Sequence, residues 1–177
     1  MAGRLTTFCT IFSVILFGCN VLKLSTVDEV KSTDLPTYLS NLVNADQEVR
    51  QDRKYWTDAE AKAKVEAVDS ANRVKLDSII TQYGYPGKSL VGDSISMYGA
   101  LIIYHGGATY SEKYLDLIAE AYLKDELDEE YYTLVINGYF METEGSHAIG
   151  FREGSEWYLD SEKAEYYRSI LKKKKNE

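Results

Sequence analysis

Cysteine is scarce in this chain of 177 residues, which contains only Cys9 and Cys19. Both lie within residues 1–19, so the sequence from Asn20 onward contains no thiol. A domain formed by that part cannot be held together by disulfides and must depend on its hydrophobic core. A catalytic thiol and a zinc site made of cysteines are excluded there for the same reason.

Basic residues are in the minority, with 20 Lys and Arg against 28 Asp and Glu and a formal charge of −8. Proteins that bind nucleic acid need a basic surface that displaces the counterions of the phosphates. The one cationic run lies at residues 172–175, which we predict to be a frayed and solvated end of the chain. We therefore expect no nucleic-acid partner.

Proline is rare as well, with 2 residues, while 12 glycines, 45% hydrophobic residues and 27% charged residues are typical of a folded protein. After removal of a leader, a chain of this length has room for one domain with a single core. We therefore expect most of the chain to fold.

Long hydrophobic runs are absent except near the N-terminus, where residues 8–17 are mostly apolar and follow Arg4. Such a run is too short to cross a bilayer core of about 30 Å as a helix, and its cationic start is typical of a signal peptide. Residues 16–19, Leu-Phe-Gly-Cys, resemble the lipobox of bacterial lipoproteins, in which Cys19 would be acylated after cleavage. The alternative is an uncleaved membrane anchor over the uncharged residues 5–22.

These features predict a signal peptide over residues 1–18, a lipidated Cys19 with a flexible tether over residues 19–34, and a folded domain over residues 35–177. The acylated cysteine would anchor the chain to a lipid bilayer. We expect a location in the cell envelope, facing the periplasm or the cell surface.

Within the predicted domain, apolar residues recur at the spacing that is typical of amphipathic helices. The first such segment covers residues 36–53. A second follows a cap at Thr57 or Asp58 and ends before Gly84. A third follows residues 92–93 and ends near His105.

Ser111 is predicted to begin a fourth helical segment, and the acidic residues 125–130 precede a fifth. The inner stripe of this fifth helix is expected to consist of Tyr131, Leu134, Val135, Gly138 and Met141. Residues 143–157 have no clear period and indicate a loop with room for a short hairpin. A last helix follows a cap at Asp160 or Ser161. The pattern predicts an all-α fold, a single compact domain of about six helices.

Several of these apolar stripes also carry polar side chains, namely Asp46, Arg50, Asp69, Asn72 and His105. Polar groups in a core must pair with one another, and Asp46 and Arg50 are four residues apart on one helix. One interpretation is an internal network that fixes how the helices pack. The other is a cleft in which a carboxylate orients His105 and Arg50 holds an anionic ligand.

A metal site is a further candidate, because imidazole and carboxylate groups bind zinc. It would combine His105 and His147, the 2 histidines of the chain, with Asp46 or Asp69. These positions lack the compact spacing of known metal motifs, so we predict no metal site.

Two short motifs also fail to support a site. Residues 145–147, Gly-Ser-His, lack the strand-to-helix turn that exposes the serine of many hydrolases. Residues 87–92 contain a lysine but lack the glycine and Ser/Thr spacing of a phosphate-binding loop. We therefore expect no cofactor.

In chain order, the polar positions and turns are Asp46, Gln47 and Arg50; Asp69 and Asn72; residues 83–86; Val91 and Gly92; and His105. This order is similar to that of a widespread bacterial family of unknown function, with Asp-Gln-x-x-Arg, Asp-x-x-Asn, Tyr-Gly-Trp-Pro, Val-Gly and His motifs. Tyr85 replaces the tryptophan, and residues 148–151 stand where that family has Tyr-Gly-Thr-Gln. The resemblance implies a mostly helical domain with a shared polar cluster, and no established activity.

The leading hypothesis is a lipid-anchored exported protein whose helical domain binds a protein or small-molecule partner. Its site would combine Asp46, Arg50 and His105 with nearby tyrosines, of which the chain has 15. The alternative is a hydrolase that uses His105 as a general base or metal ligand, oriented by Asp46 or Asp69. A purely structural role is the third possibility.

Overall fold

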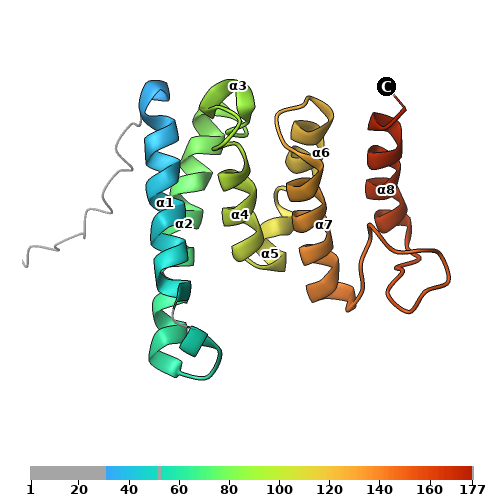
Figure 1. The fold of residues 1–177 in the computed structure, drawn as a ribbon, viewed down its shortest axis with the longest axis horizontal. Helices are drawn as coiled ribbons and strands as arrows, with labels where there is room; N and C mark the ends of the chain where they lie inside the picture. The colour runs from blue at the N-terminus through green and yellow to red at the C-terminus, as the bar shows by residue number, and fades with distance from the viewer. Residues whose placement is uncertain (1–30, 52, 177) are drawn as a thin grey trace, which may run out of the picture.

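The computed structural model describes residues 31–51 and 53–176 (Figure 1). This part of the chain is helical and contains no strand, so the predicted all-α fold is confirmed. It has eight α-helices where about six were expected, because two short helices begin in the connections between the predicted segments. The predicted signal peptide, Cys19 and most of the tether lie outside the described residues.

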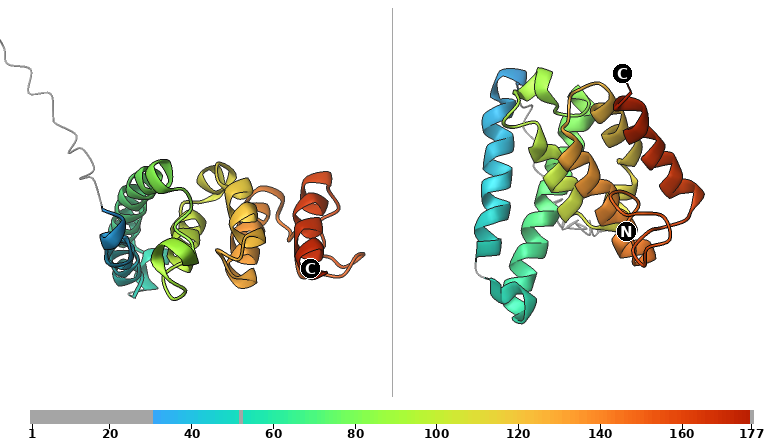
Figure 2. Two further views of the ribbon diagram at one scale, coloured as in Figure 1. Left: turned by 90° about the horizontal axis from the view of Figure 1, so that it is seen from above. Right: turned by 45° about the vertical axis from the view of Figure 1, so that its right-hand side comes forward.

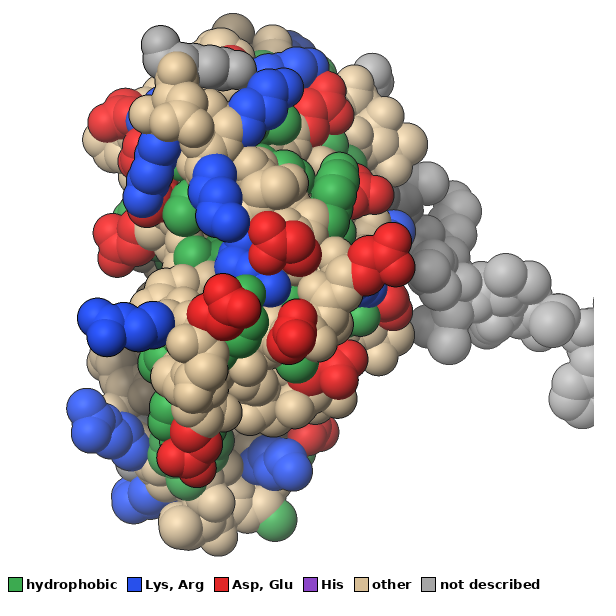
Figure 3. Space-filling view, turned by 90° about the vertical axis from the view of Figure 1, so that its right-hand side faces the viewer, with side chains coloured by type: hydrophobic (Ala, Val, Ile, Leu, Met, Phe, Trp, Pro, Cys, Tyr) green, Lys and Arg blue, Asp and Glu red, His purple; other side chains and the backbone are tan. Residues whose placement is uncertain are grey.

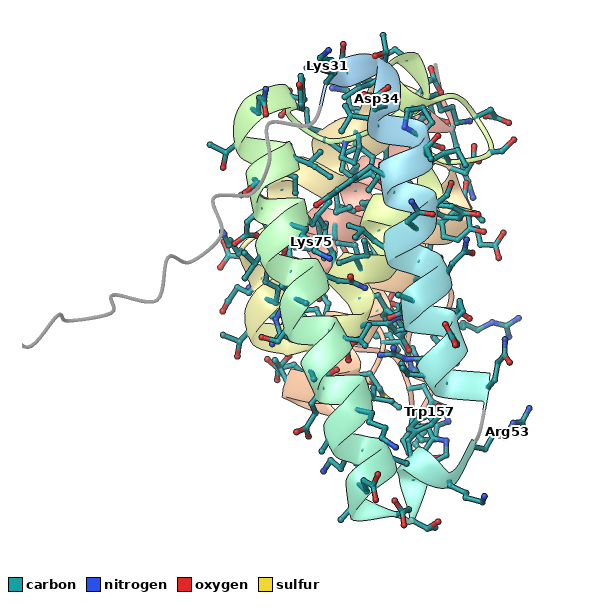
Figure 4. The ribbon with its side chains drawn as sticks, turned by 90° about the vertical axis from the view of Figure 1, so that its left-hand side faces the viewer. Lys31, Asp34, Arg53, Lys75 and Trp157 are labelled. Carbon is teal, nitrogen blue, oxygen red and sulfur yellow. The ribbon has the colours of Figure 1, made fainter. Side chains whose placement is uncertain are left out.

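Helices α1 (Leu35–Gln51) and α2 (Ala59–Tyr83) form an antiparallel hairpin, joined by the 3-10 helix η2 (Arg53–Trp56). Figure 4 shows the two helices side by side, with Lys31 and Asp34 near one end and Arg53 at the other. The predicted cap of α2 is confirmed, because the Asp58 carboxylate accepts a hydrogen bond of 2.8 Å from Ala61 N. A short 3-10 helix, η1 (Ser32–Asp34), precedes α1.

The middle of the chain forms α3 (Lys88–Val91), α4 (Met97–His105) and α5 (Ala108–Glu112). The prediction that Ser111 begins a helix is wrong, because Ser111 lies inside α5 and its buried hydroxyl donates to Ile103 O at 3.0 Å. The start of α5 is satisfied from a distant helix instead, since Ala108 N donates to the Glu142 carboxylate at 2.7 Å.

The remaining helices are α6 (Leu115–Leu123), α7 (Glu129–Glu144) and α8 (Glu162–Lys174). The buried face of α7 consists of Tyr132, Val135, Ile136, Tyr139 and Phe140. Apart from Val135, this is not the predicted stripe. The middle of α7 is apolar on most sides, so periodicity alone could not identify the face that α4, α5 and α6 cover.

The C-terminal part confirms one prediction and departs from two others. The cap at Ser161 is confirmed by a 3.2 Å hydrogen bond from Ala164 N to Ser161 Oγ. The connection of residues 145–161 contains one isolated parallel bridge, between His147 and Tyr158, rather than a hairpin. The lysine run is not frayed, because α8 continues through Lys174 and the ammonium groups of Lys174 and Lys175 pair with Asp125 and Glu129.

The hairpin of α1 and α2 lies at one end of an elongated row of helices, and α8 lies at the other (Figures 1 and 2). The core runs along this row and unites all the longer helices. Its most deeply buried side chains include Leu35, Leu39, Leu76, Ile103, Leu115, Ile118, Tyr132, Ile136 and Phe140. None of the helices formed by residues 31–51 and 53–176 combines the length and the apolar character needed to cross a membrane.

Candidate binding site

The structure brings the predicted polar residues together where α1, α2 and α4 meet. Asp46 is the buried centre of this group, with 3% of its side chain exposed. Its Oδ1 accepts a hydrogen bond from Arg50 Nη1 at 2.6 Å and lies 3.0 Å from His105 Nδ1. Its Oδ2 accepts from Gln47 Nε2 at 2.7 Å. We call Asp46, Gln47, Arg50, Asp69 and His105 the polar cluster.

Charge balance in the polar cluster depends on Arg50. The second guanidinium nitrogen, Nη2, donates to both oxygens of Asp69 at 2.8 Å, so one cation from α1 bridges carboxylates on α1 and α2. Burial by itself raises the pKa of Asp46, but the contacts with His105 and Arg50 outweigh it and hold that pKa below its usual value. Burial raises the pKa of Asp69 in spite of its hydrogen bonds with Arg50.

This geometry pairs the charged groups of the polar cluster with one another. Both terminal nitrogens of Arg50 are occupied by carboxylates, so the guanidinium is not free to hold the anionic ligand that the cleft hypothesis assigned to it. Asn72 is buried outside the ion pairs, where its amide donates to Leu42 O at 3.0 Å and ties α2 to α1. The arrangement favours the interpretation in which these side chains fix the packing of three helices.

The alternative chemistries find little geometric support. Within the described part of the chain, no three His, Cys, Asp or Glu side chains are placed to hold a metal ion, so His105, His147, Asp46 and Asp69 do not form one site. The Ser146 hydroxyl donates a hydrogen bond to Trp157 O at 2.7 Å, so it holds the loop together and is not placed as the nucleophile of a hydrolase.

A pocket of about 410 Å³ lies along α7. Its lining comes from one side of that helix together with α4 and the loop that follows α7. The lining residues are Glu130, Thr133, Leu134, Asn137, Gly138 and Met141 of α7, Tyr104 of α4 and His147. The positions on α7 recur every three or four residues, so they form one stripe about 16 Å long. We call this pocket the α7 groove.

Tyr104 forms one wall of the α7 groove because Gly138 leaves room for its ring. A Cβ atom at Gly138 would lie 2.6 Å from the ring carbons, well inside van der Waals contact. The tyrosine ring therefore rests on the backbone of α7 and remains 36% exposed. Met141, one turn further along, is 40% exposed, so two large apolar side chains face solvent beside the groove.

His147 forms the other wall. Its backbone is held by a hydrogen bond from His147 N to Trp157 O at 3.1 Å, and its ring packs against Phe151 with centroids 4.7 Å apart. The His147 Nδ1 atom is buried and has no hydrogen-bond partner among the described residues. Phe151 and Trp157 are 40% and 44% exposed, so the apolar surface continues past the groove onto this loop.

Two side chains with no distinctive local sequence signal, Asn137 and Arg168, fix the loop against the helices. The Asn137 amide donates to Ile149 O at 3.1 Å and accepts from Ile149 N at 2.9 Å. Arg168 of α8 is buried and donates to Ala148 O at 2.9 Å and to Leu159 O at 2.8 Å. The wall carrying His147 is therefore connected to both α7 and α8.

Two other pockets, of about 410 and 350 Å³, lie beside α6. Their linings include acidic and basic side chains, Glu120 with Lys124 in one and Asp116 with Lys173 in the other. Figure 3 shows a similar mixture of both charges across the α8 end of the molecule. The α7 groove differs in having one carboxylate, from Glu130, no cation and a mainly apolar wall, which is typical of a binding site.

Leu134, Gly138 and Met141 were predicted to face the core, and in the structure they line this groove instead. The spacing of these residues was visible in the sequence, but the sequence could not show that they line a groove beside Tyr104 and His147. No family model matches the chain, and no curated protein or solved structure shows significant similarity to it, so the resemblance to the bacterial family stays a prediction.

Proposed function

We propose that this chain is an exported lipoprotein, anchored by acylated Cys19, whose helical domain is a binding module with its site in the α7 groove. The observation that carries the binding role is the α7 groove itself, in which Leu134 and Met141 lie beside Tyr104 and His147 on a mainly apolar wall. Burial of apolar side chains against a partner removes them from water and lowers the free energy of the complex. The leader and the lipobox-like residues 16–19 support the anchoring role.

The polar cluster has a supporting part in this proposal. Arg50 and its two carboxylates hold α1 against α2, and His105 connects the end of α4 to Asp46. The residue before His105 is Tyr104, so the same contacts keep a groove wall in place. A site built on packed helices retains its shape without a ligand.

A neutral apolar dye tests the binding role. Nile red should bind the wild-type domain with a blue-shifted emission, and Met141→Glu should weaken this binding at least about tenfold, because the dye would meet a charge in an apolar wall. Val74→Glu is the matched control, since Val74 is 56% exposed on α2 and does not line the groove. Equal titrations for the two variants, or no dye binding to the wild type, would refute the binding role.

Cys19→Ser tests the anchor. In a bacterial host that processes lipoproteins, the wild type should incorporate labelled palmitate and sediment with membranes, whereas the variant should carry no label and migrate differently on a gel. A variant that stays in the membrane with its leader intact and with wild-type mobility would show that the segment is an uncleaved anchor.

A second candidate function is hydrolysis with His105 as general base. It is favoured by the 3.0 Å contact of His105 Nδ1 with Asp46, which would orient the ring, while His105 Nε2 has no hydrogen-bond partner in the described part of the chain. Turnover of a chromogenic ester that is lost in His105→Gln would favour this candidate, and equal rates for the two proteins would exclude it.

A further inference from the structure

We infer that the α7 groove binds a basic amphipathic segment of a polypeptide, with apolar side chains along the groove and a Lys or Arg beside Glu130. The inference rests on the proposed function, because it names the partner for the same groove. It depends on the charge and the length of the groove.

Charge favours a cationic partner. Glu130 is exposed in the groove and forms no ion pair with another described residue, whereas the neighbouring Glu129 is paired with Lys175 at 2.9 Å. Beyond the other end of the stripe, three residues past Met141, Glu144 is also exposed and forms no ion pair with another described residue. Carboxylates therefore lie at both ends of the stripe, and the lining contains no Lys or Arg.

The net charge of the whole chain strengthens the preference for a cationic partner. Its formal charge is −8, so its field attracts cationic partners and repels anionic ones at a distance. An acidic peptide would meet that field and the carboxylate of Glu130 without a compensating cation in the groove. A basic segment is attracted by the net charge of the chain at a distance and by the Glu130 carboxylate once it is in the groove.

The length of the groove fits a helical segment of two to three turns. The stripe of about 16 Å matches roughly eleven residues of a partner helix. Apolar side chains spaced three or four residues apart on that helix would face Leu134, Met141 and Tyr104, which is the usual way in which an amphipathic helix occupies a groove. The polar side of such a helix would carry the basic residues that reach Glu130.

Three synthetic peptides test this inference. They share one amphipathic helical sequence with leucines on its apolar side and differ only in carrying Lys, Gln or Glu at the polar positions. Binding to the folded chain is measured by fluorescence anisotropy at low and at high salt. The Lys peptide should bind most tightly and lose affinity in salt, the Gln peptide should bind more weakly, and the Glu peptide should bind least.

Glu130→Gln identifies the carboxylate responsible. The substitution should weaken binding of the Lys peptide between about twofold and fivefold, which is the range of one exposed ion pair. It should leave the affinity of the Gln peptide unchanged. Glu48→Gln is the matched control, because Glu48 is exposed on α1 and does not line the groove. Both variants replace a surface carboxylate, so both should fold as the wild type does.

The outcomes separate this inference from the proposed function. If the Gln peptide binds as tightly as the Lys peptide and Glu130→Gln changes nothing, the preference for a basic partner is refuted while the groove remains a binding site. If Nile red binds but none of the peptides does, the peptide class is refuted. If neither the dye nor any peptide binds, the proposed function fails and the inference fails with it.

Discussion

Replacing Arg50 with methionine is expected to lower the free energy of unfolding by about 3–5 kcal/mol, the usual cost of removing one partner from a buried ion group. The methionine keeps the aliphatic volume, but Asp46 and Asp69 are left facing each other without their shared cation. Only 15% of the Arg50 side chain is exposed, so water compensates the two carboxylates poorly. Urea denaturation at neutral pH measures the loss.

Arg53→Met is the control for this change, because Arg53 is exposed in η2 and its loss should change stability by no more than about 0.5 kcal/mol. An Arg50→Met variant that loses less than about 1 kcal/mol would mean that solvent, rather than the protein, balances these carboxylates.

The pKa shifts of Asp46 and Asp69 determine how the stability of the domain changes with pH. Because the pKa of Asp46 is lowered in the folded state, its contribution to stability is present above its unfolded pKa, near 4, and is lost as the pH falls through the folded value. Asp69, whose pKa burial raises, partly offsets this trend. The difference between wild type and Arg50→Met should therefore shrink in acid.

Replacing Arg168 with methionine is expected to lower the free energy of unfolding by about 2–4 kcal/mol and to loosen the loop of residues 145–161. Its guanidinium donates to Ala148 O and Leu159 O, lies 4.4 Å from the centre of the Tyr158 ring and contacts Glu165. Carbonyls that lose a charged donor inside the protein cost about 1–3 kcal/mol each. The loop should therefore open more often than α7 and α8 do.

Amide hydrogen exchange checks the site of this loosening. The amides of His147 and Leu159, which donate across the bridge, should exchange faster in Arg168→Met. Arg152→Met is the control, because Arg152 lies in the same loop with its side chain exposed. Equal exchange in the two variants would show that Arg168 does not hold the loop.

Local signals explain why much of the fold was predictable. Asp58 and Ser161 cap the helices that follow them, since an N-cap depends only on residues within one turn. Asp46 and Arg50 pair because four residues separate them on one helix. Their meeting with His105 was a reasonable expectation, because polar groups on buried stripes must find partners.

Contacts between distant segments explain the rest. The carboxylate that satisfies the start of α5 belongs to Glu142, and the cation that anchors the loop belongs to Arg168, so neither role is visible in the local sequence. The face of α7 could not be chosen because most of its middle residues are apolar. A stripe that lines a groove and a stripe that faces the core have the same spacing, and only the packing of α4 and the loop distinguishes them.

The central claim is that the binding site is the α7 groove and not the polar cluster. Nile red titrations of Met141→Glu and His105→Gln, compared with the wild type, test this claim most directly. The account predicts at least about a tenfold loss of affinity for Met141→Glu and a change within about twofold for His105→Gln. Wild-type affinity in Met141→Glu together with lost affinity in His105→Gln would place the site at the polar cluster and contradict the account.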